Sequence, residues 1–269
     1  MFCYNSCMPK VTSHDGTIIA YDKKGQGPIL ILVLGALNKR GSGKKLAQLL
    51  ADKFTVISYD RRGRGDSTDT LPYSTSKEVE DLEALIDDLG GKAYLYGHSS
   101  GAVLALLAAK QLGDKVSALA MYELPYNADP QAQTVANEYR TTLRQLLAKD
   151  DRDEAVSLFV KSVGVTDKQV DAMKRLTMWK GLTAMAPTLA YDTIHLMEEY
   201  PSVDASEVAT RTLVMYGAAS PAFMGDTAQK LADTMPNAKL TALNGQTHDV
   251  KPDILAPELI KFYDGIMQL

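Results

Sequence analysis

Tyr94-Leu95-Tyr96-Gly97-His98-Ser99-Ser100-Gly101-Ala102 is the stretch that decides the fold, because it places a G-x-S-x-G motif between an apolar run typical of a strand, 93–96, and one typical of a helix, 102–112. A strand that turns sharply into a helix strains the backbone at the central residue and needs glycines where larger side chains would collide. The hydroxyl then stands at a helix N-terminus, whose amides and dipole favour developing negative charge. The stretch predicts Ser99 as a nucleophile, whereas a helix cap without chemistry is the alternative.

A serine nucleophile requires a base to remove its proton, and the sequence contains four histidines. His14 lies in an early turn, His98 lies inside the motif with its ring expected to point away from the nucleophile, and His195 lies in a helical region. His248 alone follows the last predicted strand, on a loop that returns to the carboxyl edge of the sheet. We therefore predict His248 as the general base, with an exposed loop histidine as the alternative.

The order of predicted elements indicates an α/β fold. Strands and helices alternate on both sides of a middle segment, which indicates βαβ units and a mainly parallel sheet. The middle segment, 127–203, has helical spacing and no convincing strand, so we expect an all-helical cap inserted in a core domain formed by 1–126 and 204–269. The predicted strands are 10–12, 17–21, 29–34, 55–59, 93–96, 117–121, 212–216 and 239–243, and the predicted core helices are 44–52, 77–89, 102–112, 227–235 and one from 254 onward.

Composition excludes several classes of function. The 269 residues are 45% hydrophobic and 23% charged, which is ordinary for a globular protein. A net charge of −4 without a basic stripe argues against nucleic acid as a partner, and no apolar stretch approaches the roughly 20 residues that span a bilayer. Cys3 and Cys7 are the only cysteines, and their segment lacks the long apolar region of a secretory signal, so we expect two free thiols in a reduced, cytoplasmic protein.

Sequence signals for metals and cofactors are also missing. No HExxH motif, Cys/His cluster or dinucleotide fingerprint occurs, so we expect neither a metal nor a cofactor. Gly41-Ser42-Gly43-Lys44-Lys45 hints at a phosphate loop, but Asn38 and Lys45 stand where that motif requires glycine and a hydroxyl residue.

Four features together resemble the α/β-hydrolase superfamily, in its capped esterase and haloperoxidase-like branch, over nearly the whole chain. They are the motif around Ser99, the turn Tyr59-Asp60-Arg61-Arg62-Gly63-Arg64-Gly65-Asp66-Ser67, the loop Leu34-Gly35-Ala36, and the late His248. The resemblance implies a mostly parallel eight-stranded sheet, a cap after the sixth strand, and a nucleophile, acid and histidine in that chain order.

The acid departs from the usual pattern of that family. It normally follows the seventh strand, where this chain reads Gly217-Ala218-Ala219-Ser220-Pro221 and Ser220 takes the acid's place. Some relatives carry the acid after the sixth strand, and here Glu123 stands at that point among apolar residues. We predict Glu123 as the triad acid; the alternatives are Asp226, Asp249 or no acid, with Glu123 a solvated hinge residue.

The resemblance also implies an oxyanion hole formed by the backbone N–H groups of Ser100 and Ala36, with Leu37 as the alternative to Ala36. Leu34 replaces a histidine that is frequent in the family, a change that matters little for a backbone donor. The arginines of the turn at 61–64 are expected to be solvated residues of a structural turn, rather than an anion site.

These inferences favour a cofactor-independent serine hydrolase that cleaves a small carboxylic ester or lactone through an acyl-enzyme on Ser99. Dehalogenases and epoxide hydrolases on this fold use an aspartate nucleophile, which disfavours those reactions. A cofactor-free perhydrolase would use the same residues, and a ligand-binding or signalling protein with slow or no turnover is the alternative from a different class. The sequence does not indicate an oligomeric state.

Overall fold

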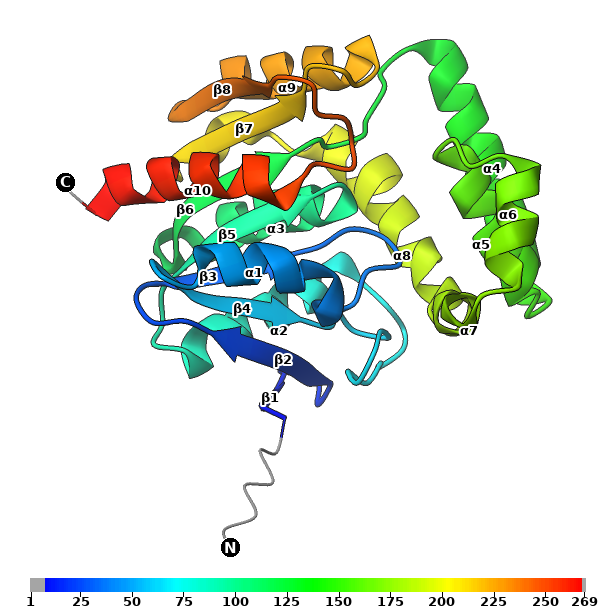
Figure 1. The fold of residues 1–269 in the computed structure, drawn as a ribbon, viewed down its shortest axis with the longest axis horizontal. Helices are drawn as coiled ribbons and strands as arrows, with labels where there is room; N and C mark the ends of the chain where they lie inside the picture. Colours follow the sequence, from blue (N-terminus) through cyan, green and yellow to red (C-terminus); the bar gives the residue numbers. More distant parts are fainter. Residues whose placement is uncertain (1–7, 268–269) are drawn as a thin grey trace, which may run out of the picture.

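Eight strands form one sheet in the order β1-β2-β4-β3-β5-β6-β7-β8 in the computed structural model, which describes residues 8–267 (Figure 1). β1 and β4 both pair with β2 antiparallel, and every other neighbouring pair is parallel. This confirms the predicted eight-stranded, mostly parallel sheet; Cys3 and Cys7 lie outside the described residues. The strands are β1 Lys10–Thr12, β2 Ile18–Lys24, β3 Ile29–Val33, β4 Thr55–Tyr59, β5 Ala93–His98, β6 Val116–Tyr122, β7 Thr212–Gly217 and β8 Ala238–Leu243.

Register between the central strands brings their carboxyl ends to one edge. His98, the last residue of β5, pairs with Tyr122, the last of β6, and Tyr122 pairs with Met215 of β7. β3 is wholly apolar, and both β3 and β4 are almost wholly buried, as strands covered on both faces must be. Whatever follows β5, β6 and β7 in the chain therefore emerges side by side, at the edge where open α/β sheets bind ligands.

Helices cover both faces of the sheet. α2 (Thr75–Asp88), α3 (Ser100–Leu112) and α9 (Ala222–Thr234) pack on one face, while α1 (Lys44–Leu50) and α10 (Pro252–Met267) pack on the other (Figure 1). All five were predicted, although α9 begins five residues before the expected start at 227. Pro221 precedes the helix, where its fixed φ and missing N–H suit a helix start.

The segment between β6 and β7 contains helices and, in this fully described stretch, no strand. We call it the helical insertion. A separate apolar cluster centred on Leu143, Val156 and Trp179 holds its helices together, and Figure 1 shows them beyond the carboxyl ends of the strands. Val135, whose apolar side chain contributes to the helical spacing of this segment, is exposed. The insertion comprises α4 Pro130–Ala148, α5 Arg152–Ser162, α6 Asp167–Lys174, α7 Thr177–Ala184 and α8 Leu189–Ile194, with short turns of 3-10 helix at Ala186–Thr188 and Tyr200–Ser202 and of π-helix at His195–Glu199.

Residues 8–267 lack two kinds of feature. No helix in this range has the length and apolar character needed to cross a bilayer. No group of three or more histidine, cysteine or acidic residues in the same range is arranged to hold a metal ion.

Candidate active site

Ser99 sits on the sharp turn between β5 and α3 with a strained backbone. Its φ of 58° and ψ of −129° are rare for any residue other than glycine. The turn is closed by tight packing, since a Cβ on Gly97 would lie 2.6 Å from the Ala102 Cα and one on Gly101 would overlap the Val33 carbonyl. The sequence thus forces the Ser99 side chain out at the N-terminus of α3, where it is partly exposed.

His248 and Glu123 meet at the same edge of the sheet. His248 Nδ1 lies 2.8 Å from Glu123 Oε2, although the two residues are 125 positions apart in the chain. Because a carboxylate can only accept, Nδ1 carries the proton and Nε2 is left free to act as a base. No hydrogen bond joins Ser99 Oγ to His248 among the described residues, so the base is oriented but not yet engaged, as is common without substrate.

Glu123 is fully buried and stays ionised through its hydrogen bonds. Burial alone opposes ionisation, but bonds from His248, Ser220 and the Gly217 N–H hold its pKa below the usual range. Ser220, which replaces the acid expected after β7, therefore donates to the acid that comes from β6. The backbone of Glu123 has a φ of 44°, a second strained residue at the site.

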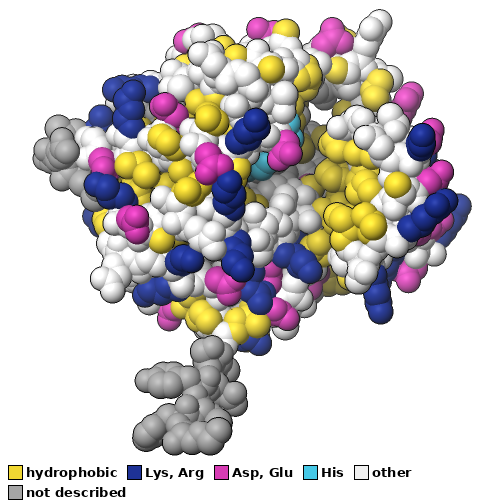
Figure 2. Space-filling model, viewed as in Figure 1, with side chains coloured by type: hydrophobic (Ala, Val, Ile, Leu, Met, Phe, Trp, Pro, Cys, Tyr) yellow, Lys and Arg dark blue, Asp and Glu magenta, His cyan; other side chains and the backbone are white. Residues whose placement is uncertain are grey.

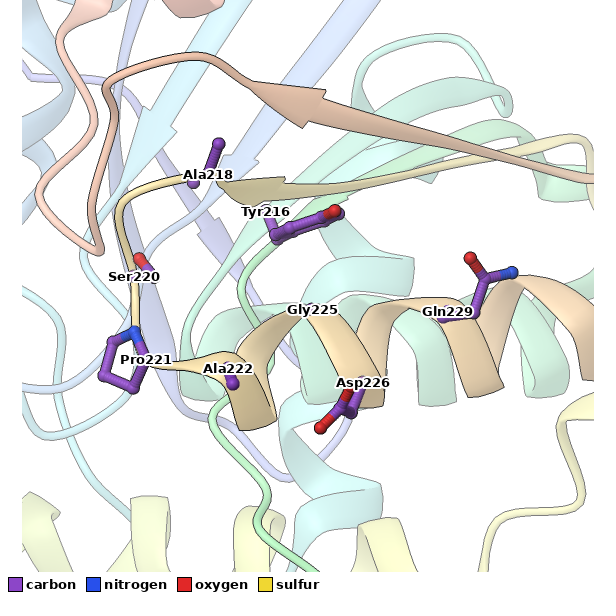
Figure 3. A pocket seen from close by; sticks show the side chains of 9 residues that line it. Tyr216, Ala218, Ser220, Pro221, Ala222, Gly225, Asp226 and Gln229 are labelled. Carbon is purple, nitrogen blue, oxygen red and sulfur yellow. The ribbon is translucent and has the colours of Figure 1, made fainter.

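The two alternative acids lie elsewhere. Asp226 and Asp249 are exposed, and neither forms a hydrogen bond or ion pair with His248 in the described part of the chain. Figure 3 shows Asp226 on α9, after the turn that carries Ser220, beside a pocket of about 340 Å³ between the end of β7 and α9. The solvated-hinge interpretation of Glu123 is wrong, because its side chain is enclosed.

Two further residues hold the loop that carries His248. His98 Nε2 donates to the His248 carbonyl at 3.0 Å, and the Tyr122 hydroxyl donates to the Thr247 carbonyl at 2.6 Å. The His98 and His248 rings lie 4.8 Å apart between centroids. Burial, together with the neighbouring His248, lowers the pKa of His98 to about 4, which keeps it neutral. Sequence reasoning assigned neither His98 nor Tyr122 a role here; its only clue was their position at the ends of β5 and β6.

The loop after β3 lies directly against the nucleophile. A Cβ on Gly35 would lie 2.8 Å from Ser99 Cβ and 3.3 Å from Ser99 Oγ. Leu37 has a φ of 53°, and Ala36 and Leu37 pack against the apolar cluster of the helical insertion. The loop therefore lies between the nucleophile and the insertion, where the predicted second oxyanion donor belongs.

The expectation that the arginines of the turn after β4 are solvated is wrong. Arg61, Arg62 and Arg64 are 2%, 0% and 1% exposed. Arg62 makes two 2.7 Å bonds to Asp81 of α2, away from the site. An arginine is buried when carboxylates from other elements neutralise it, and those partners are remote in sequence.

The other two arginines join a buried ionic network behind Ser99. Arg61 binds Glu78 of α2, and both Arg61 and Arg64 bind Asp192 of α8. Nη2 of Arg64 donates to both oxygens of Asp192, at 2.9 and 3.0 Å. His195 completes the network as an acceptor from Arg61 through Nδ1. Burial opposes ionisation of Asp192, but both guanidiniums hold its pKa below the usual range.

A hollow opens between the core and the helical insertion (Figure 2). Histidine side chains are visible inside it, and hydrophobic side chains gather on the insertion where it faces the hollow. A substrate entering there would meet an apolar wall on the insertion side.

Comparison with known proteins finds a matching family and similar folds. The model of the Alpha/beta hydrolase family matches residues 37–258. The crystal structure of an alpha/beta hydrolase from Sphaerobacter thermophilus DSM 20745 is similar with a TM-score of 0.83 and 45% sequence identity, over 95% of this chain and 100% of that chain.

Two curated relatives match over shorter segments. The Uncharacterized hydrolase YraK of Bacillus subtilis (strain 168) is 36% identical over 95 residues, 34% of this chain and 35% of that protein. The 2-(acetamidomethylene)succinate hydrolase of Mesorhizobium japonicum is 35% identical over 108 residues, 39% of this chain and 38% of that protein. The chain thus spans well under half the length of either relative.

Proposed function

The chain belongs to the alpha/beta hydrolase family, and from that premise we propose that it is a serine hydrolase that cleaves a carboxylic ester or lactone through an acyl-enzyme on Ser99. The observation that carries the proposal is the 2.8 Å contact between His248 Nδ1 and the buried carboxylate of Glu123, beside a serine held in a strained turn. A histidine held by a carboxylate through Nδ1, with Nε2 free, at the same sheet edge as a serine hydroxyl is the arrangement that nucleophilic acyl transfer requires.

In the first half-reaction, His248 Nε2 takes the proton of Ser99 as its Oγ attacks the ester carbonyl. Glu123 stabilises the imidazolium that forms, and the N–H groups of Ala36 and Ser100 bind the oxyanion. When the tetrahedral intermediate collapses, the C–O bond to the alcohol breaks and His248 gives its proton to the departing oxygen. In a lactone the departing alcohol stays attached to the acyl chain.

In the second half-reaction, His248 deprotonates a water molecule that attacks the acyl-enzyme. The ester bond to Ser99 breaks, the proton returns to Ser99 Oγ and the carboxylic acid leaves. We assign the helical insertion the role of a cap over this site, because its apolar side faces the hollow and its core packs against the Ala36 and Leu37 loop. An apolar wall favours substrates with a neutral acyl group.

Steady-state hydrolysis of p-nitrophenyl acetate and butyrate, with a short lactone in parallel, tests the proposal. We expect turnover by the wild type, its loss in Ser99→Ala, and unchanged turnover in Ser162→Ala, which removes an exposed hydroxyl on α5. A fluorophosphonate should label Ser99 once per chain, as located by mass spectrometry of peptides.

Other outcomes would contradict the proposal. A single acyl group retained on Ser99 without turnover would identify a ligand-binding protein with an intact triad. Peroxide-dependent halogenation in carboxylate buffer that exceeds ester hydrolysis would identify a perhydrolase. Turnover that survives in Ser99→Ala would exclude Ser99 as the nucleophile.

A further inference from the structure

Both halves of the proposed oxyanion hole are attached to one buried carboxylate of the helical insertion. Asp192 of α8 is 4% exposed and accepts a 2.7 Å hydrogen bond from the Ser100 hydroxyl. It also binds the Arg64 guanidinium through both of its oxygens. The remaining end of Arg64, Nη1, donates to the Gly35 carbonyl at 2.7 Å.

The Gly35 carbonyl belongs to the same peptide group as the Ala36 N–H. A strong donor on the carbonyl oxygen of a peptide fixes the plane of that peptide and polarises its N–H, which then becomes a better donor. The loop lies against Ser99 and enters a strained conformation at Leu37, just after Ala36. The backbone N–H and the side-chain amide of Asn38 also donate to the Gly35 carbonyl, but both at 3.4 Å, so the 2.7 Å bond from Arg64 is the shortest of the three.

We infer that Arg64, held in place by Asp192, is a positioning residue that aims and polarises the Ala36 N–H toward the oxyanion. Asp192 fixes the Ser100 side of the hole through the Ser100 hydroxyl, so the insertion is coupled to both donors through one side chain. The inference rests on the proposed function, since an oxyanion forms only if Ser99 attacks a carbonyl.

Arg62 provides a matched control. It is a buried arginine of the same turn that binds both oxygens of a buried carboxylate, through Nε and Nη2 where Arg64 uses Nη2 alone. Its partner is Asp81 rather than Asp192, and it does not donate to Gly35. Arg64→Met and Arg62→Met each remove one buried guanidinium. Arg62→Met also leaves the buried Asp81 carboxylate without its arginine partner. A purely structural role for Arg64 therefore predicts equal effects of the two substitutions.

The experiment measures kcat and KM per active site, titrated with a fluorophosphonate, together with Tm. In Arg64→Met we expect kcat to fall about 10- to 100-fold, less than the loss of a whole oxyanion donor, with KM within about threefold of wild type. Affinity for a trifluoromethyl ketone, which forms an oxyanion on Ser99, should fall by a similar factor. Arg62→Met should lower Tm and leave kcat within about twofold.

Milder variants keep the test decisive if Arg64→Met does not fold. Arg64→Lys keeps the charge but cannot bind Asp192 and Gly35 together, so it should retain part of kcat. Ser100→Ala removes only the hydroxyl contact with Asp192, and its effect on kcat should be non-additive with that of Arg64→Lys. Equal kcat losses in the Arg64 and Arg62 variants, or an unchanged kcat in Arg64→Lys and Ser100→Ala, would overturn the inference.

A measurement without turnover separates this inference from the proposed function. In protein labelled with 15N-alanine, the Ala36 amide resonance should move in Arg64→Lys and stay in place in Arg62→Met. An inactive wild type would refute the proposed function, whereas an unmoved Ala36 resonance would refute the role of Arg64 even in an active enzyme.

Discussion

Replacing Glu123 by glutamine tests the relocated acid at the point where the structure is most specific. In wild type, Oε1 accepts from the Gly217 N–H at 2.8 Å and from the Ser220 hydroxyl, while Oε2 faces His248 Nδ1. A glutamine keeps the shape but must place its one oxygen on one side. The Ser220 hydroxyl can rotate to accept, but the Gly217 N–H cannot.

That asymmetry determines the magnitude. If the glutamine oxygen faces His248, the buried Gly217 N–H is left unsatisfied, which costs about 1 to 3 kcal/mol. The amide NH2 therefore turns toward His248 Nδ1, and the imidazole proton moves to Nε2, so that Nε2 can no longer act as a base. Return to the active orientation costs the same 1 to 3 kcal/mol, about as much as leaving that N–H unsatisfied. Loss of the carboxylate charge beside the imidazolium costs about 1.5 to 3 kcal/mol more. The sum, about 2.5 to 6 kcal/mol, predicts a decrease in kcat of about 10²- to 10⁴-fold with little change in KM.

The assay compares kcat and KM for p-nitrophenyl butyrate with imidazole 15N resonances of His248, which report the tautomer directly. Asp226→Asn and Asp249→Asn serve as controls and should stay within about twofold of wild type, because both carboxylates are exposed. A Glu123→Gln variant within tenfold of wild type that keeps the proton on Nδ1 would refute the assignment. A large loss in either aspartate variant would identify the true acid.

Three other perturbations follow from the same contacts, and each has its own measurement. Ser220→Ala removes one hydrogen-bond donor to Glu123 and should lower kcat only about 2- to 10-fold, because the Gly217 N–H and His248 still donate to the carboxylate. A loss of kcat as large as in Glu123→Gln would show that the Ser220 hydroxyl itself takes part in the chemistry. Gly35→Ala places a methyl group 3.3 Å from the nucleophile oxygen and should lower kcat at least about 10-fold. Gly265→Ala, at an exposed position of α10 with open space around it, should leave kcat unchanged and raise stability by up to about 1 kcal/mol; equal kcat values in the two variants would refute the close approach of Gly35 to Ser99. His98 has a pKa of about 4 in the folded protein and 6.5 in the unfolded chain, so only the unfolded chain gains a proton there as pH falls from 6.5 to 4. In urea unfolding, the free energy of unfolding of wild type should therefore fall by up to about 3 kcal/mol more than that of His98→Gln over this pH range. Equal pH dependence in the two proteins would contradict a neutral His98 that supports the loop.

Local sequence patterns predicted most of the fold together with Ser99 and His248, and the resemblance to the family pointed to Glu123. The alternation of apolar runs with helical spacing identified all eight strands, because a parallel sheet requires buried strands and covering helices. Boundaries were less accurate at β2, where Asp22 to Lys24 look like a polar turn but pair with β4. β2 is longer than predicted because its backbone pairs with β4, a contact between distant residues that the local sequence pattern does not indicate.

The contacts that support the proposed site could not be predicted from the sequence. Arg61 and Arg64 were expected to be solvated because charged residues in a turn usually are, and their partner Asp192 stands about 130 residues away on α8. His98 and Tyr122 lacked a predicted role for the same reason, since the loop that they hold is formed by residues near 248.

The sequence by itself therefore determined the sheet, the strained turn at Ser99 and the helical character of the insertion, all of which arise from the spacing of neighbouring residues. Only the tertiary structure decided that Glu123 reaches His248, that Ser220 supports that acid and that the buried arginines join the insertion to the loop beside Ser99. Such contacts depend on the register of strands and the burial of charge, which bring distant residues within hydrogen-bond reach in a dry interior where each charge must find a partner.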